Sequence, residues 1–121
     1  MLRILAVASM LALAPSAATA EEFESSFSVE LIDVERFVVM LNERLDLGFD
    51  AEALGAFARG TSSGERTRRL KASFGGEVVP VTFIVHVPYV DPPEVIFLSK
   101  SSALIAAMDT VVDEFLDTVD Y

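Results

Sequence analysis

The fold is decided by residues 66–89, which read RTRRLKASFGGEVVPVTFIVHVPY. Two long stretches rich in β-forming residues, 66–74 and 77–89, are separated by the pair Gly75-Gly76. Glycine adopts the positive φ angles that a two-residue hairpin turn requires, so this pattern predicts a β-hairpin. The rest of the domain is expected to be built around it.

A two-residue turn also fixes the register of the hairpin. Phe74 faces Glu77, and Lys71 faces Pro80 at a pair whose backbone groups are not bonded to each other. The other expected pairs are Ala72 with Val79, Leu70 with Val81, and Arg68 with Phe83. Because proline has no N–H, we expect that no further strand pairs with Pro80 on its other side.

The same register sorts the side chains onto two faces. The apolar face, which we expect to be the core side, holds Leu70, Ala72, Phe74, Val79, Val81, Phe83, Val85 and Val87. The polar face holds Thr67, Arg69, Lys71, Ser73, Thr82, Ile84 and His86. Arg66 and Arg68 fall on the apolar side, so either they lie beyond the covered part of the sheet or the strand begins later.

The N-terminal part of the domain contains a strand followed by a helix. Residues 22–31 alternate apolar and polar side chains, which predicts a half-buried strand. The alternative is a helix that begins near Ser28 and leaves no strand. Apolar residues then recur at helical spacing from Val34, with Asp33 as the N-cap and Gly48 as the residue that ends the helix.

The remaining patterns complete an α+β fold. We expect a short helix over residues 50–59, an apolar interior or doubly covered strand over residues 95–98, and a final helix capped by Ser101 or Ser102. Together they predict a mostly antiparallel sheet of three to four strands, covered on one face by two main helices plus the short helix. The polar face of the sheet stays open unless a partner covers it.

Residues 1–20 have the pattern of a secretory signal peptide. Arg3 gives a positive start, residues 4–14 form an apolar run, and Ala18-Thr19-Ala20 matches a small-x-small cleavage site. The run is shorter than the roughly 20 residues that span a bilayer. We therefore expect a single mature domain, residues 21–121, without a transmembrane segment, in the bacterial periplasm or secreted beyond it.

Composition and motifs exclude several classes of function. The 52% of hydrophobic residues argue against disorder despite the net charge of −10, and the absence of Cys argues against disulfide scaffolds and thiolate-metal sites. A chain with this much negative charge repels phosphate backbones, and nucleic acid is therefore not an expected partner. No phosphate loop or nucleophile motif is present, and a single His without Cys makes a poor metal site. No cofactor, metal or catalytic residue is assigned.

The basic residues are concentrated in one segment. Residues 59–71 hold five basic residues and one acidic residue, Glu65, within an acidic chain. Arginine forks bind carboxylates and phosphates, so the candidate binding residues, with two polar neighbours on the open face, are Arg66, Arg68, Arg69, Lys71, Thr82 and His86. The alternative is that these cations neutralise the protein's own acidic helices.

Three functions are compatible with this surface. The first is an exported, non-catalytic interaction module that binds an envelope protein or a second subunit through the open, locally basic sheet face. The second is a small anion or lipid-headgroup binder with a pocket near Arg66 and Arg68. The third, an enzyme that uses His86 as an acid–base group, ranks last because no second catalytic group is identifiable.

Cleavage after Ala20 is expected to give a mature protein that begins at Glu21 and is one unit more negative than the full chain, because Arg3 is lost. Intact-mass measurement and N-terminal sequencing of protein from a periplasmic extract check the cleavage site. A recovered protein that still begins at Met1 would contradict export.

Overall fold

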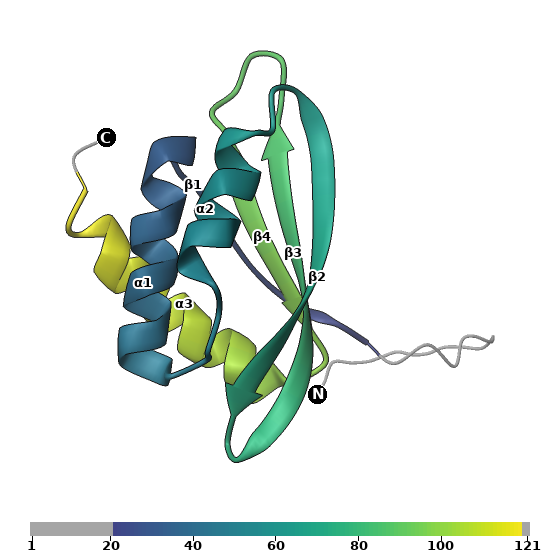
Figure 1. Ribbon diagram of the computed structural model, residues 1–121, viewed down its shortest axis with the longest axis vertical. Helices are drawn as coiled ribbons and strands as arrows, with labels where there is room; N and C mark the ends of the chain where they lie inside the picture. Colours follow the sequence, from purple (N-terminus) through teal and green to yellow (C-terminus); the bar gives the residue numbers. More distant parts are fainter. Residues whose placement is uncertain (1–20, 120–121) are drawn as a thin grey trace, which may run out of the picture.

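The computed structural model describes residues 21–119 and shows an α+β fold with a four-stranded antiparallel sheet (Figure 1). In chain order the elements are β1 (Phe23–Ser28), a 3-10 turn (Leu31–Asp33), α1 (Val34–Leu45), α2 (Ala51–Arg59), β2 (Gly64–Phe74), β3 (Glu77–Val87), β4 (Glu94–Ser99) and α3 (Ser102–Leu116). The strand order is β1-β4-β3-β2, so β1 and β2 are the two edges. The fold class expected from the sequence is confirmed, whereas the proposed signal peptide lies outside the described residues.

The β2–β3 hairpin has the predicted register. Gly75 and Gly76 have φ angles of 62° and 79°, as a two-residue turn of this kind requires. Every expected pair is present, including Lys71 opposite Pro80. On its other side β3 pairs with β4 only from Thr82 onward, so Pro80 faces no strand there, as expected.

The two other strands also match the sequence patterns in part. β1 exists, so the alternative of a helix in its place is wrong, but Phe23 at its start is 39% exposed rather than in the core. β4 lies between β1 and β3, as expected for an interior strand. Ile96 and Leu98 on its second face are half-buried, because the helices cover only the other face.

The end of α1 differs from the prediction. Asp46, rather than Gly48, is the left-handed residue that ends the helix, with a φ of 55°, and its N–H bonds to the carbonyl of Asn42; Gly48, two residues later, also has a positive φ, of 78°. The Asn42 amide side chain bonds both backbone groups of Phe49. These two hydrogen bonds hold the chain after α1 close to the helix, which ends at Leu45. The spacing of apolar residues in the sequence does not predict them.

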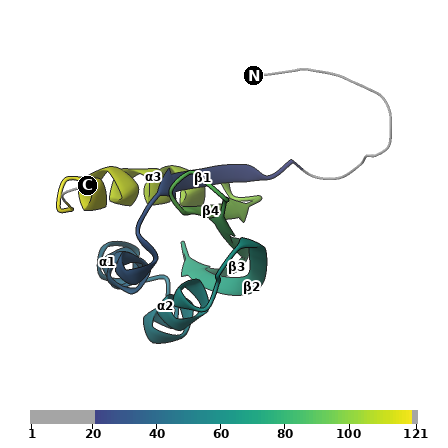
Figure 2. The same cartoon turned by 90° about the horizontal axis from the view of Figure 1, so that it is seen from above.

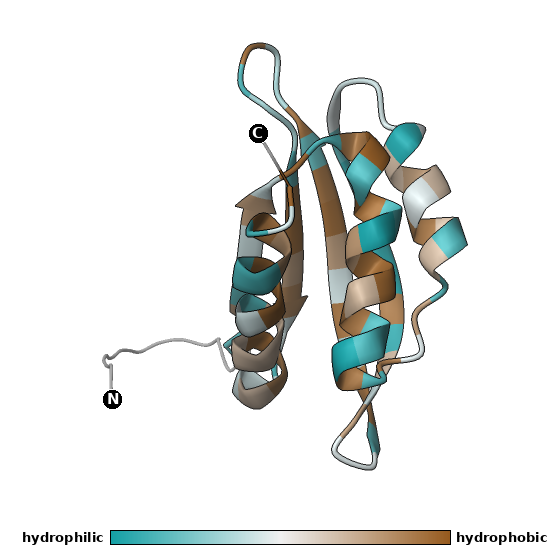
Figure 3. Ribbon diagram, turned by 90° about the vertical axis from the view of Figure 1, so that its left-hand side faces the viewer, coloured by the Kyte–Doolittle hydropathy of each residue, from teal (hydrophilic) through white to brown (hydrophobic). Residues whose placement is uncertain are grey.

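All three helices lie on one side of the sheet, and their apolar sides face it (Figures 1 and 3). Seen from above, α1 and α2 lie on the same side of β2 and β3 (Figure 2). α3 lies beside α1, and Ser101 caps it by accepting the N–H of Leu104. None of the helices within residues 21–119 has the length and apolar character to cross a bilayer.

Phenylalanine rings join the helices to the sheet. The ring centroids of Phe27 and Phe37 are 4.7 Å apart, those of Phe37 and Phe115 are 5.2 Å apart, and those of Phe83 and Phe97 are 5.2 Å apart. Tilted and edge-on contacts of this kind add about 0.5–1.5 kcal/mol each beyond burial. Because the chain has no Cys, this core holds the domain together without disulfides.

The close crossing of α1 and α2 explains a glycine inside a helix. A Cβ on Gly55 would lie 2.6 Å from the Cβ of Glu35, a distance that real Cβ atoms do not tolerate. The approach brings α2 against α1, and α2 in turn carries Phe57 toward β2 and β3.

Candidate functional site

The hairpin register separates the six candidate binding residues into three places. The first group is Arg69, Lys71 and Thr82, the second is Arg66 and Arg68, and the third is His86 alone. The first and third groups lie on the face of the sheet that points away from the helices, which we call the open face. The second group lies on the helix side.

The first group lines a hollow at one end of the open face. Arg69 lies opposite Thr82 in the β2–β3 ladder, and Lys71 is the next residue of β2 on the same face. With Lys100 they border a hollow of about 660 Å³, in which Glu22 is the one acidic lining residue. Val78, at the margin of the hollow, is 67% exposed. The hollow therefore offers three cations beside an apolar wall.

Lys100 is a member of this group that the sequence analysis missed. Leu98 pairs with Thr82, so the chain direction of β4 carries Lys100 toward Pro80 and the hollow. Finding it requires the β3–β4 register. The loop over residues 88–93 is too long and irregular to fix that register in the way that a two-residue turn does.

Arg66 and Arg68 rest on an aromatic ring of α2. The guanidinium carbon of Arg66 is 4.3 Å from the centroid of Phe57, and that of Arg68 is 5.9 Å away. Both side chains are exposed, and β2 begins at Gly64, earlier than predicted. Arg66 and Arg68 therefore lie on the helix side of the sheet but at the margin of the area that the helices cover. Their cation–π contacts with Phe57 are worth about 0.5–1 kcal/mol each at exposed sites.

His86 lies at the other end of the open face, between two carboxylates. Its cross-strand neighbours are Glu65 on β2 and Glu94 on β4. The nearest serine in this row is Ser28, which lies beyond Glu94 and so two strands from His86, about 10 Å away. Nucleophilic catalysis needs a direct Ser–His hydrogen bond, and this row does not place the two residues for one.

A metal site is not formed by the described residues either. Across residues 21–119, no three His, Asp or Glu side chains gather in a way that would hold a metal ion. Glu65, His86 and Glu94 share a row of the sheet without converging on one point.

The arginines outside β2 form ion pairs with acids on or beside the helices. Within residues 21–119, Arg36 pairs with Asp33 at 3.6 Å, Arg44 with Glu114 at 3.0 Å, and Arg59 with Glu35 at 3.3 Å. The hydrogen bond and the charge of Glu114 raise the pKa of the Arg44 guanidinium above its ordinary value. Two of these ion pairs join helices: Arg44–Glu114 links α1 to α3, and Arg59–Glu35 links α2 to α1.

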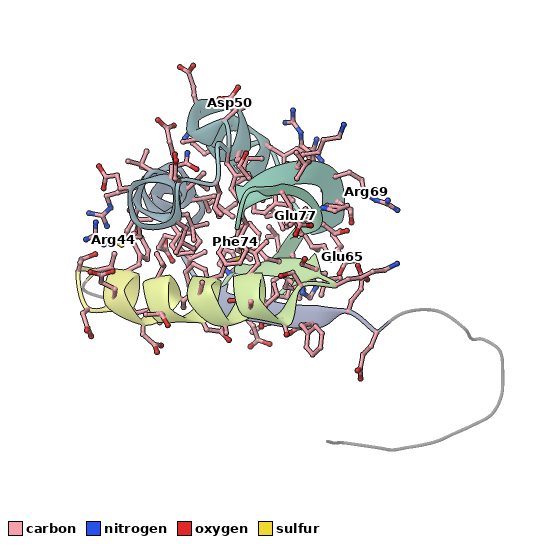
Figure 4. All side chains as sticks on the ribbon, turned by 90° about the horizontal axis from the view of Figure 1, so that it is seen from below. Arg44, Asp50, Glu65, Arg69, Phe74 and Glu77 are labelled. Carbon is pink, nitrogen blue, oxygen red and sulfur yellow. The ribbon has the colours of Figure 1, made fainter. Side chains whose placement is uncertain are left out.

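The cations of β2 take no part in these pairs. Within residues 21–119, no ion pair joins Arg66, Arg68, Arg69 or Lys71 to an acidic side chain. Figure 4 shows Arg69 pointing away from the body of the protein, on the side opposite Arg44. Of the five basic residues in residues 59–71, only Arg59 therefore pairs with an acidic residue of the protein itself.

Comparison of the chain with protein-family models, curated proteins and solved structures finds no match.

Replacing Arg69 and Lys71 together with alanine is expected to leave the free energy of unfolding within about 0.5 kcal/mol of wild type, because neither side chain pairs with an acid of the domain. Urea denaturation at low salt measures it. A loss of more than about 1 kcal/mol would show that these cations do stabilise the folded domain.

Proposed function

We propose that the protein is an exported, non-catalytic interaction module that binds an acidic region of another envelope protein through β2 and the adjoining open face. The observation that carries the proposal is the set of unpaired cations on β2. Arg69 and Lys71 are exposed on the open face and pair with no acid of the domain, so they form a surface suited to carboxylates, while Arg66 and Arg68 lie on the other side of the same strand.

The middle of the open face favours a protein over a simple anion. Ile84 and Ile96 pair across β3 and β4 and are half-buried, and Leu98 lies in the next row. An apolar centre beside a charged rim is the usual anatomy of a protein–protein interface. Glu65 and Glu94 lie on the same face, and their carboxylates would repel a polyanion that covered the whole surface.

A small anion or a lipid headgroup is the second candidate. It is favoured by the hollow beside Arg69, Lys71 and Lys100, which is a different place from the predicted pocket near Arg66 and Arg68. A thermal-shift screen with phosphate, short carboxylates and anionic lipids tests this candidate, since a ligand of the folded state raises the melting temperature. A flat response to all of them would count against it.

Charge reversal tests the leading proposal. The double variant Arg69→Glu, Lys71→Glu is expected to lose envelope partners that wild type captures, because the surface changes by four charge units and repels carboxylates. The control for net charge is Arg36→Glu, Arg44→Glu, which changes the charge equally on the helix side. Because both arginines hold ion pairs there, its melting temperature is compared with that of wild type before the capture experiment.

The captured proteins are compared by quantitative mass spectrometry, at low and at high salt. The proposal predicts partners that are present with wild type and control, absent with the β2 variant, and weakened by salt. An identical set of partners for all three proteins would refute it.

A further inference from the structure

We propose that the partner adds an extended acidic segment as a fifth strand along the outer edge of β2, over residues 65–71. This inference rests on the proposed function and names the form of the partner. The segment is held by backbone hydrogen bonds to β2, and its carboxylates lie on the open face beside Arg69 and Lys71.

The register shows which backbone groups of β2 point outward. Phe74 and Glu77 flank a two-residue turn and form a hydrogen-bonded pair. Bonded and non-bonded pairs alternate along an antiparallel ladder, so the even-numbered residues of β2 bond to β3. The odd-numbered residues direct their N–H and C=O groups away from it.

Two further contacts of β2 agree that its odd-numbered residues point outward. Lys71, an odd-numbered residue, faces Pro80, which has no N–H to give to β2. The N–H of Ser73, the next odd-numbered residue, bonds outward to the carbonyl of Leu47 at 2.9 Å. Leu47 therefore covers the end of this edge nearest the turn.

The rest of the edge is uncovered within the described part of the chain. Glu65, Thr67, Arg69 and Lys71 are all exposed, and no backbone hydrogen bond beyond the β2–β3 ladder reaches them. They span about 20 Å of extended chain. Four residues with free donors and acceptors in a row are a template for an added strand.

The side chains of these residues select the occupant. The same odd-numbered residues carry their side chains on the open face, so a paired strand places its own side chains directly beside Arg69 and Lys71. Carboxylates at those positions meet two cations that have no partner in the domain. Opposite charges directly across a ladder stabilise the pairing, and like charges oppose it.

A second copy of β2 is a poorer occupant by the same rule. Self-pairing that places Arg69 opposite Lys71 brings like charges together across the ladder, and self-pairing centred on Thr67, which places Glu65 opposite Arg69, brings Arg66 opposite Arg68 on the helix side. Charged side chains on an edge strand are a known protection against such pairing. An acidic segment meets no cation–cation contact along this edge, so Arg69 and Lys71 favour it over a second copy.

N-methylated peptides test the backbone contacts. The probe is a fluorescein-labelled ten-residue peptide in which glutamate alternates with threonine, measured by fluorescence anisotropy at low ionic strength. One derivative is methylated on the glutamate amides and the other on the threonine amides. The proposed segment runs antiparallel to β2, so the glutamates opposite Arg69 and Lys71 form hydrogen-bonded pairs and turn their amides toward β2. The first derivative is therefore expected to lose binding and the second to keep it.

Equal binding by the two derivatives would overturn strand addition, and the reverse order would overturn an antiparallel segment with its carboxylates beside Arg69 and Lys71. A peptide in which lysine replaces glutamate is the charge control, and it is expected not to bind.

The variant Thr67→Pro tests the same edge from the protein side. The N–H that proline removes points outward, so no bond to β3 is lost, and edge positions of this kind accept proline. Peptide affinity is expected to fall about fivefold to tenfold, whereas Thr67→Val, which keeps the N–H, leaves it unchanged. Circular dichroism and the melting temperature verify the fold, and the methylated peptides decide the matter if this variant does not fold.

The outcomes separate this inference from the proposed function. If Arg69→Glu, Lys71→Glu abolishes peptide binding while Thr67→Pro preserves it, the basic surface holds and strand addition is wrong. If neither variant changes binding, both ideas fail. Light scattering is expected to show a monomer, and a dimer that Thr67→Pro dissociates would mean that a second copy occupies the edge.

Discussion

The two-residue turn at Gly75-Gly76 is the constraint on which the rest of the structure depends. A turn of two residues admits one register, and that register assigns each side chain of β2 and β3 to the helix side or the open face. It also places Pro80 in the part of β3 that does not pair with β4, and it directs alternate backbone groups of β2 outward. A shift of one residue would bury the cations and expose the core.

The core accounts for the openness of the other face. Phe37 contacts rings from β1 and α3, and Phe97 contacts rings from β3 and the segment before α2, so all the aromatic packing lies on one side of the sheet. The helices then pair charges among themselves, as Arg44 does with Glu114. This arrangement leaves the cations of β2 without internal partners and available to an acidic surface.

The parts of the fold that depend on neighbours in the chain were predictable, and those that depend on distant contacts were not. The hairpin pairs, the start of α1 at Val34 and the cap of α3 all follow from local spacing. The predicted side-chain cap at Asp33 is wrong, because a 3-10 turn over residues 31–33 leads into α1 and the Asp33 side chain makes no capping bond. The end of α1 was not predictable, because Asn42 binds the backbone seven residues away. The candidate site divides in the same way: the places of Arg69 and Thr82 follow from the turn, whereas Lys100 needs the β3–β4 register and Arg66 needs the ring of Phe57.

Amide hydrogen exchange of the free protein, followed residue by residue by NMR, tests the central claim most directly. An open β2 edge predicts alternation: Arg68 and Leu70, which bond to β3, exchange slowly, and Thr67, Arg69 and Lys71 exchange rapidly. Ser73 breaks the alternation and is slow, because its N–H bonds to Leu47. Slow exchange at Thr67, Arg69 and Lys71 as well would show that the edge is already paired in the free protein and would contradict the account.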